Sequence, residues 1–210
     1  MSPARRKSLF EKLSVAIPNP ETELAHDNPF QLLISVILSA QATDISVNKV
    51  TPALFEAFPD PESMATARVE QILSFIRSIG LAPSKAKNIV NTCSLLVEKH
   101  QGQIPQTLEE LIALPGVGRK TANVMLNTAF GKSVIAVDTH IFRVSNRTGL
   151  AIGKDVRDVE DGLMKNVPRK FKKDAHHLLI LHGRYVCKAR KPECSQCVIR
   201  RQCQFEEKII

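Results

Sequence analysis

Four cysteines in the C-terminal part of the chain constrain its local fold more than any other feature: Cys187, Cys194, Cys197 and Cys203. The spacing Cys-x6-Cys-x2-Cys-x5-Cys is short enough for all four sulfurs to converge on one inorganic centre. Four thiolates suit either a tetrahedral zinc ion or an iron–sulfur cluster. Zinc modules usually contain two close Cys-x2-Cys pairs, whereas only Cys194 and Cys197 form one here. The spacing alone therefore leaves both centres open.

The fifth cysteine, Cys93, lies far upstream on the apolar stripe of a segment with helical spacing. Disulfide frameworks belong to small secreted domains with cysteines throughout, so we expect no disulfides and an inert core thiol at Cys93. The cysteine segment, residues 187–203, contains several basic residues and one acidic residue, Glu193. The basic residues are Lys188, Arg190, Lys191, Arg200 and Arg201. We therefore expect this segment to carry a basic surface.

The overall charge favours a polyanion as partner. The formal net charge is +8, and a basic excess attracts nucleic acid, acidic lipid or acidic protein. Single-strand binders usually stack bases on aromatic side chains, but this chain has no Trp and one Tyr, which favours a duplex. No segment approaches the about 20 apolar residues of a membrane span, and no secretory signal follows the basic start. We expect a monomer without a membrane partner, located in the cytoplasm and associated with the nucleoid if bacterial.

Apolar residues recur at helical spacing along nearly the whole chain, which predicts an all-α fold. Expected helices in the second half are Thr121–Phe130, Thr139–Thr148, Asp155–Val167 and Lys173–Tyr185. Only Val134–Val137 reads as a strand, and it is too short to define a sheet. The length allows two domains, which we place at residues 22–132 and at residues 1–21 plus 133–210.

Two helix starts carry capping signals. Asp44 is expected to cap the helix that follows it. Thr107 and Glu110 have the spacing of a capping box ahead of an apolar pair, where each side chain would bond the other residue's main-chain N–H. That start opens a helical hairpin expected near residues 108–130.

The string Leu114-Pro-Gly-Val-Gly-Arg-Lys120 joins the two helices of that hairpin. Its glycines, Gly116 and Gly118, permit backbone angles closed to other residues, so the chain can turn tightly. The turn would present N–H groups beside the positive end of the second helix, which makes an anion site. A DNA phosphate fits there without any base being read. A P-loop is excluded, because it needs four residues between its glycines and a preceding strand.

Two residues are candidates for catalysis. Lys120 stands at the start of the second hairpin helix, where the helix end and the neighbouring Arg119 both disfavour the ammonium form. A neutral amine can attack a carbon electrophile. Asp138, at the end of an apolar run, is expected to cap the next helix. Its carboxylate could also stabilise positive charge on a sugar or move a proton.

Taken together, these strings resemble the endonuclease III class of DNA glycosylases in the helix-hairpin-helix superfamily. The likeness extends over almost the whole chain and includes Leu38-Ser-Ala-Gln-Ala-Thr-Asp44, Ile79-Gly-Leu81, Leu114–Ala122, Val137–Arg143, His182-Gly-Arg184 and the four cysteines. The resemblance implies two helical lobes with DNA crossing the cleft between them, and a [4Fe-4S] cluster on Cys187, Cys194, Cys197 and Cys203.

The resemblance also implies roles for residues. Lys120 would attack C1′ of the damaged nucleotide and form a Schiff base, with Asp138 assisting, and β-elimination would cleave the strand 3′ to the abasic site. Gln41 and Leu81 would fill the gap left by the flipped nucleotide. Phosphates would meet the hairpin residues Leu114, Gly116, Val117, Gly118 and Arg119, and the basic residues Lys188, Arg190 and Lys191.

The substrate implied by the likeness is double-stranded DNA containing oxidised pyrimidines or abasic sites. Two alternatives stay open. One is a non-catalytic helix-hairpin-helix DNA-binding protein with a structural metal segment. The other is a glycosylase of the same superfamily with another lesion preference, such as an adenine glycosylase.

Overall fold

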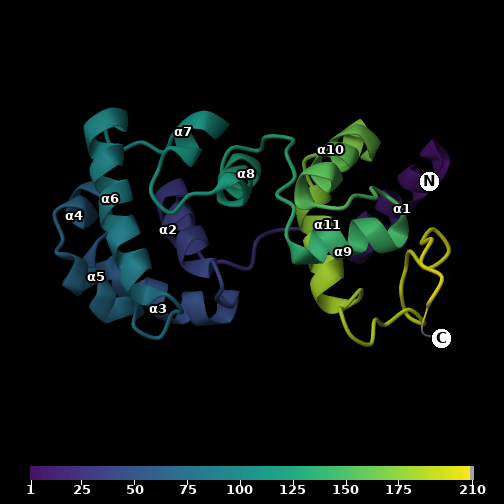
Figure 1. The fold of residues 1–210 in the computed structure, drawn as a ribbon, viewed down its shortest axis with the longest axis horizontal. Helices are drawn as coiled ribbons and strands as arrows, with labels where there is room; N and C mark the ends of the chain where they lie inside the picture. The colour runs from purple at the N-terminus through teal and green to yellow at the C-terminus, as the bar shows by residue number, and fades with distance from the viewer. Residues whose placement is uncertain (209–210) are drawn as a thin grey trace. The chain divides into compact units, whose positions relative to one another are not determined.

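The computed structural model describes residues 1–208, and all regular secondary structure within them is helical (Figure 1). The elements are α1 (Pro3–Ala16), α2 (Pro29–Ser39), α3 (Asp44–Ala57), α4 (Pro61–Ala65), α5 (Val69–Ile76), α6 (Ala82–His100), α7 (Leu108–Ile112), α8 (Arg119–Thr128), α9 (Thr139–Thr148), α10 (Val156–Asn166), η1 (Arg169–Phe171) and α11 (Ala175–Tyr185). This confirms the all-α prediction. In the described part of the chain, no helix has the length and apolarity that a bilayer crossing demands.

The chain divides into two compact units. The central unit is Thr22–Phe130, and the terminal unit combines Met1–Glu21 with the chain from Gly131 onward. The terminal unit is thus built from both ends of the sequence, whereas the central unit is one continuous stretch.

Helix α2 is the core helix of the central unit. Asn28 caps it by accepting from Gln31 N at 3.0 Å, and Pro29 fits the first turn, where no amide donor is needed. Every residue from Leu32 to Leu38 is buried, so α2 has no solvent face. It packs against α3, α6 and α8, and α6 packs in turn against α4 and α5 (Figure 1). Burial on all sides explains why α2 is apolar nearly throughout.

The terminal unit packs α11 against α9 and α1, with α10 against α9. Phe10 of α1 stacks on Phe171 of η1 with ring centroids 5.6 Å apart, which joins the first helix to the last third of the chain. The buried core includes Leu9, Leu13 and residues of α9, α10 and α11, and the partly buried Cys187 and Cys197 pack against it. The cysteine segment therefore rests on the same core that holds α1.

Three local expectations need correction. Val134–Val137 forms no strand: Ile135, Ala136 and Val137 are buried in a connection, because no partner strand exists in residues 1–208. Thr43, not Asp44, caps α3. Its side chain accepts from Ser46 N at 3.2 Å, and Asp44 occupies the first turn, where a carboxylate complements the helix dipole.

The third correction concerns the capping box at α7. Thr107 Oγ1 accepts from Glu110 N at 3.3 Å, as expected. The Glu110 carboxylate, however, accepts from the Thr107 hydroxyl at 2.6 Å rather than from a main-chain N–H. The box is therefore formed on one side only.

Candidate functional site

The helical hairpin consists of α7, the turn 113–118 and α8, all in the central unit. Leu114 and Val117 are 2% and 5% exposed and anchor the turn in the core. Val117 N donates to Leu114 O at 3.1 Å, and Thr92 Oγ1 of α6 donates to Pro115 O at 2.7 Å. The apolar pair and these two bonds fix the turn, so its remaining residues face outward without having to pack.

The two glycines of the turn do different work. Gly116 has φ +78°, and a Cβ there would lie 2.9 Å from Asn88 Nδ2. Glycine is required at this position by the backbone and by space. Gly118 has an ordinary extended backbone, φ −88° and ψ 174°, and no heavy atom lies within 4 Å of a Cβ built there. The expected backbone freedom is thus used at Gly116 and not at Gly118.

The open space at Gly118 adjoins the start of α8. Gly118 is the N-cap of this helix, and the first turn of any helix leaves N–H groups without intrahelical acceptors. An anion can approach such a turn closely where no side chain covers it. Lys120, the second residue of α8, is exposed, and Arg119 is half-buried.

Asp138 belongs to the terminal unit and caps α9. Its Oδ1 accepts from Ile141 N at 2.8 Å, and the side chain is half-buried at the end of the buried run Ile135–Val137. The expected cap is confirmed. It employs one carboxylate oxygen, Oδ1. A half-buried carboxylate held in one orientation can stabilise a nearby cation or accept a proton.

Gln41 and Leu81 have an uncommon backbone conformation. Their φ values are +55° and +61°, in the left-handed region that costs free energy for any residue with a Cβ. Gln41 is exposed and Leu81 is 57% exposed. A Cβ on Gly80 would stand 3.4 Å from Gln41 O, so the two segments are in contact. Strained, exposed residues of this kind occur mainly at functional sites.

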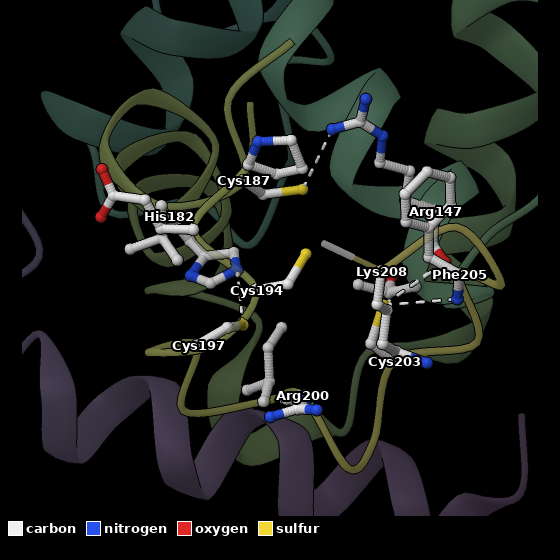
Figure 2. Close-up of a pocket in the computed structure, with 14 residues that line it drawn as sticks. Arg147, His182, Cys187, Cys194, Cys197, Arg200, Cys203, Phe205 and Lys208 are labelled. Atoms are coloured by element: carbon white, nitrogen blue, oxygen red, sulfur yellow. Dashed lines mark hydrogen bonds between the residues drawn. The ribbon is translucent and has the colours of Figure 1, made fainter. Parts of the chain in front are cut away.

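The four cysteines line one cavity in the terminal unit, together with His182, Arg147, Ile199 and Phe205, among others (Figure 2). Polar groups reach the sulfurs. Arg147 Nη1 lies 3.7 Å from Cys187 Sγ, Phe205 N lies 3.4 Å from Cys203 Sγ, and His182 Nε2 lies 3.7 Å from Cys197 Sγ. N–H groups around cysteine sulfurs are a common feature of iron–sulfur sites, where they tune the reduction potential.

The cavity disfavours unbound thiolates. Burial raises the pKa of the Cys197 thiol to about 11 and also raises that of Cys203. A thiolate at neutral pH would therefore need positive charge inside the cavity, as a metal centre provides. Among the described residues, no three His, Cys, Asp or Glu side chains are close enough together to hold a single metal ion. A zinc ion would bring its four sulfurs within about 3.8 Å of one another, given Zn–S bonds of about 2.3 Å.

Three histidines of α11 are buried. His176, His177 and His182 are 3%, 7% and 3% exposed, and His182 lines this cavity. Burial lowers the pKa of His182 to about 4, so this ring is neutral at physiological pH. A neutral ring can donate one N–H toward a sulfur.

Three arginines hold the cysteine segment through its main-chain carbonyls, which sequence reasoning missed. Arg5 of α1 donates to the carbonyls of residues 201, 202 and 203 at 3.0, 2.8 and 3.4 Å. Arg143 donates to Cys187 O at 2.8 Å and to Gly183 O at 2.7 Å. Arg147 donates to the carbonyls of residues 188 and 189 at 2.7 and 3.0 Å. The one available signal was the i, i+4 spacing of Arg143 and Arg147, which puts both on one helix face.

The basic residues of the cysteine segment are not equivalent. Lys188 Nζ pairs with Glu193 Oε1 at 2.5 Å, so its charge is partly neutralised within the segment. Arg190 and Lys191 are exposed, and Lys191 has a positive φ of +50°. Of the three residues assigned to phosphates, Arg190 and Lys191 offer the stronger field to a polyanion.

Comparison with known proteins agrees with these features. Residues 34–169 match the family model described as HhH-GPD superfamily base excision DNA repair protein. Endonuclease III of Escherichia coli (strain K12) is 54% identical over 209 residues, which cover 100% of this chain and 99% of that protein.

Two solved structures are also similar. A non-covalent endonuclease III–DNA complex matches with a TM-score of 0.91 at 44% identity, and a trapped endonuclease III–DNA covalent intermediate with 0.90 at 45%. Each match covers 97% of this chain and 96% of the other. The chain therefore belongs to the HhH-GPD superfamily of base excision DNA repair proteins and, within it, to the endonuclease III family of DNA glycosylases and abasic-site lyases.

Proposed function

We propose that this enzyme removes oxidised pyrimidines from duplex DNA through a covalent bond to Lys120 and then cleaves the strand 3′ to the abasic site. The observation that carries the proposal is the position of Lys120. Its exposed amine stands in the first turn of α8, two residues after the uncovered Gly118. A phosphate bound at that turn would keep the amine close to a nucleotide. The covalent DNA intermediate of the endonuclease III relative supports a nucleophile in this family.

The chemistry needs an amine with a free electron pair. The Lys120 nitrogen bonds to C1′ while the bond between C1′ and the base breaks. The base leaves with the electron pair of the broken bond and takes up a proton. Loss of the amine proton and opening of the sugar ring give a Schiff base. Removal of a proton from C2′ then expels the 3′ phosphate, and water releases the lysine. Asp138 would stabilise positive charge on the sugar and accept protons.

The grip on DNA would come mainly from phosphates. The turn that carries Gly116 and Gly118 would bind one phosphate through main-chain N–H groups, and Arg119 would add charge. Arg190 and Lys191 would bind further phosphates from the cysteine segment, with a smaller contribution from Lys188. Because binding of this kind releases counterions, affinity for undamaged duplex should fall steeply with salt. Since its substrate is DNA and a relative of this chain is the bacterial endonuclease III of Escherichia coli, we propose that the enzyme acts in the cytoplasm.

Gln41 and Leu81 would enter the base stack when the damaged nucleotide leaves it. The Gln41 amide can pair with the orphaned base, and Leu81 provides an apolar wedge. Exposure of both residues and their adjacent strained backbones support this role. Extruding a base costs a few kcal/mol in unstacking, which these side chains would partly offset.

We further propose that Cys187, Cys194, Cys197 and Cys203 bind a [4Fe-4S] cluster. The cysteines line one cavity with N–H groups near three of the sulfurs, yet their arrangement does not suit one metal ion. A four-iron cluster takes one sulfur on each iron and so tolerates a wider arrangement. The cluster, when bound, would cross-link the segment that carries Arg190 and Lys191. A colourless, zinc-containing native protein would contradict this assignment, because zinc is d¹⁰.

Trapping with borohydride tests the enzymatic proposal. The purified protein, mixed with duplex DNA containing an abasic site and reduced, should form a covalent adduct, because borohydride reduces the Schiff base. Lys120→Arg should form none, whereas Lys87→Arg, at an exposed lysine of α6 in the same unit, should form the normal amount. No adduct with the wild-type protein would favour the non-catalytic DNA-binding alternative. A set of duplexes with defined lesions would then separate oxidised pyrimidines from other substrates.

A further inference from the structure

Lys85 is a buried lysine in the first turns of α6, and the proposed chemistry does not use it. Its residue is 4% exposed. The ammonium donates to two main-chain carbonyls, Leu38 O at 2.8 Å and Ala40 O at 2.5 Å, where α2 ends. Burial lowers the pKa of Lys85, which reflects the free energy that its charge loses in the core. An apolar side chain of similar length would avoid this cost but would leave both carbonyls without this donor.

The second of these carbonyls belongs to a tight turn. Ala42 N donates to Ser39 O at 3.1 Å, Ala40 has φ −60° and ψ 114°, and Gln41 has φ +55°. These values define a type II turn with Gln41 at the third position, which normally requires Gly or Asn. A type I turn would place the same residues without a positive φ. The two types differ by a flip of the central peptide, whose carbonyl is that of Ala40.

The hydrogen bond from Lys85 therefore fixes the orientation of the central peptide, which forces Gln41 to adopt a positive φ. While the ammonium holds Ala40 O, the central peptide cannot flip to the type I orientation, and Gln41 stays in the left-handed region. The dipole of α2 adds to this, because the negative end of a helix attracts a cation.

Lys85 also contacts the second strained segment. Its main-chain N–H donates to Leu81 O at 3.0 Å, which closes the first turn of α6 directly after Leu81. Gly80 lies against Gln41 O, where a Cβ would be at 3.4 Å. One residue thus bonds the segment of Gln41 through its side chain and the segment of Leu81 through its backbone.

We propose that Lys85 is a positioning residue that holds Gln41 beside Leu81 in the conformation in which both enter the DNA stack. The proposal rests on the function proposed above for these two residues. Lys85 touches no DNA itself. It keeps the turn at Gln41 in its strained form before DNA binds. Ordering the turn therefore does not reduce the free energy of binding DNA.

The test compares two affinities of the full-length protein: for a duplex with a tetrahydrofuran abasic-site analogue and for the undamaged duplex. Lys85→Met fills a similar volume but cannot donate. This substitution should lower the ratio of the abasic-site affinity to the undamaged-duplex affinity about tenfold. A tenfold change corresponds to the free energy needed to hold one residue, Gln41, in the left-handed conformation. Affinity for undamaged duplex, which depends on phosphate contacts, should stay within about twofold. Lys87→Met, at an exposed position of α6, is the matched control and should change neither affinity.

A double-mutant cycle separates positioning from general destabilisation. Gln41→Gly should itself lower the ratio, and Lys85→Met should lower it no further in that background, because the lysine acts through Gln41. Equal effects of Lys85→Met with and without Gln41 would overturn the proposal, as would an unchanged ratio in the single variant. If Lys85→Met does not fold, Lys85→Gln, which keeps one donor group, is carried through the same cycle with the same criteria. If Gln41→Gly alone leaves the ratio unchanged, the proposed role of Gln41 fails instead.

Discussion

The central unit and the cysteine segment of the terminal unit hold their functional residues by different means. In the central unit, Gln41, Leu81 and Lys120 each lie in a helix or within two residues of one, and α2 packs directly on both α6 and α8. In the cysteine segment, no α-helix forms, and of its residues Ile199 is buried in the core. The order of this segment depends on the arginines that donate to its carbonyls and on the metal centre that we propose for the four sulfurs.

This difference affects how each region should respond to damage. A helical core resists the loss of one contact, because many apolar side chains share the burial. A segment with few apolar contacts has a low free energy of local opening, so the loss of one tie can release it. The central unit should therefore unfold cooperatively or stay folded, whereas the cysteine segment should unfold locally.

Loss of a cysteine ligand should have the largest effect. Cys197→Ala removes one sulfur and should prevent cluster binding, and because metal binding free energy is folding free energy, the local loss should reach several kcal/mol. Hydrogen exchange followed by mass spectrometry should show protection lost in residues 187–203 and retained in residues 22–130. Cys93→Ala, in the central unit, should retain the cluster. Equal loss of protection in both units would remove the contrast between them.

Replacement of Arg147 should come next. Its guanidinium donates to two carbonyls of the cysteine segment, and hydrogen bonds to charged groups contribute about 1.5–3 kcal/mol each. Because both bonds are exposed and water competes for them, Arg147→Met should destabilise the segment by about 2–3 kcal/mol, less than the full sum, measured by local hydrogen exchange of the cluster-loaded protein. Arg157→Met, at an exposed arginine of α10, is the control and should change little. If both variants behave alike, the carbonyl bonds do not hold the segment.

The two hairpin glycines offer a smaller but more selective pair of changes. Gly116→Ala should lower the free energy of unfolding by about 1–2 kcal/mol, because φ is positive and Asn88 is too close. Gly118→Ala should change stability by less than about 0.5 kcal/mol, since the added methyl group meets no atom. It should instead weaken binding to undamaged duplex by covering the phosphate position. Denaturant unfolding and a binding titration separate the two outcomes, and the reverse pattern would show that Gly118 is structural.

Acid should have the smallest effect, confined to the terminal unit. Burial is the main cause that lowers the pKa of His177 below its unfolded value of about 6.5. As pH falls through 6.5, the unfolded state therefore takes up the proton first. The free energy of unfolding then decreases until the pH reaches the lower pKa of the native state. Unfolding measured by denaturant between pH 7.5 and 5.5 should show this slope, and His177→Gln should reduce it to the part that the buried His182 contributes. A slope that the substitution leaves unchanged would assign the acid sensitivity to groups other than His177.

The helical architecture could be predicted because it follows from apolar periodicity alone. The cap at Asp138 and the helix over Thr139–Thr148 were also readable, since capping depends on near neighbours in the sequence. Val134–Val137 misled because a strand needs a partner, and none is available in the described chain. Local chemistry is therefore visible in one sequence, but pairing across distance is not.

The sites were less predictable than the fold. Positive φ values at Gln41 and Leu81 break the rule that glycine marks such positions, so no residue type announced them. Lys85 reads as a surface lysine, although it lies one turn before Ile89 on the buried face of α6. The bonds from Arg5 to residues 201–203 join opposite parts of the sequence, and only the folded chain reveals them.

Those bonds from Arg5 have a consequence for synthesis on the ribosome. The carbonyls that Arg5 binds are made 196–198 residues after Arg5, and at about 5–20 residues per second this interval is roughly 10–40 s. During that time Leu9, Phe10 and Leu13 have few permanent partners, while the continuous stretch of residues 22–130 can already fold. A chaperone that shields α1 in the growing polypeptide would therefore favour recovery of the finished enzyme.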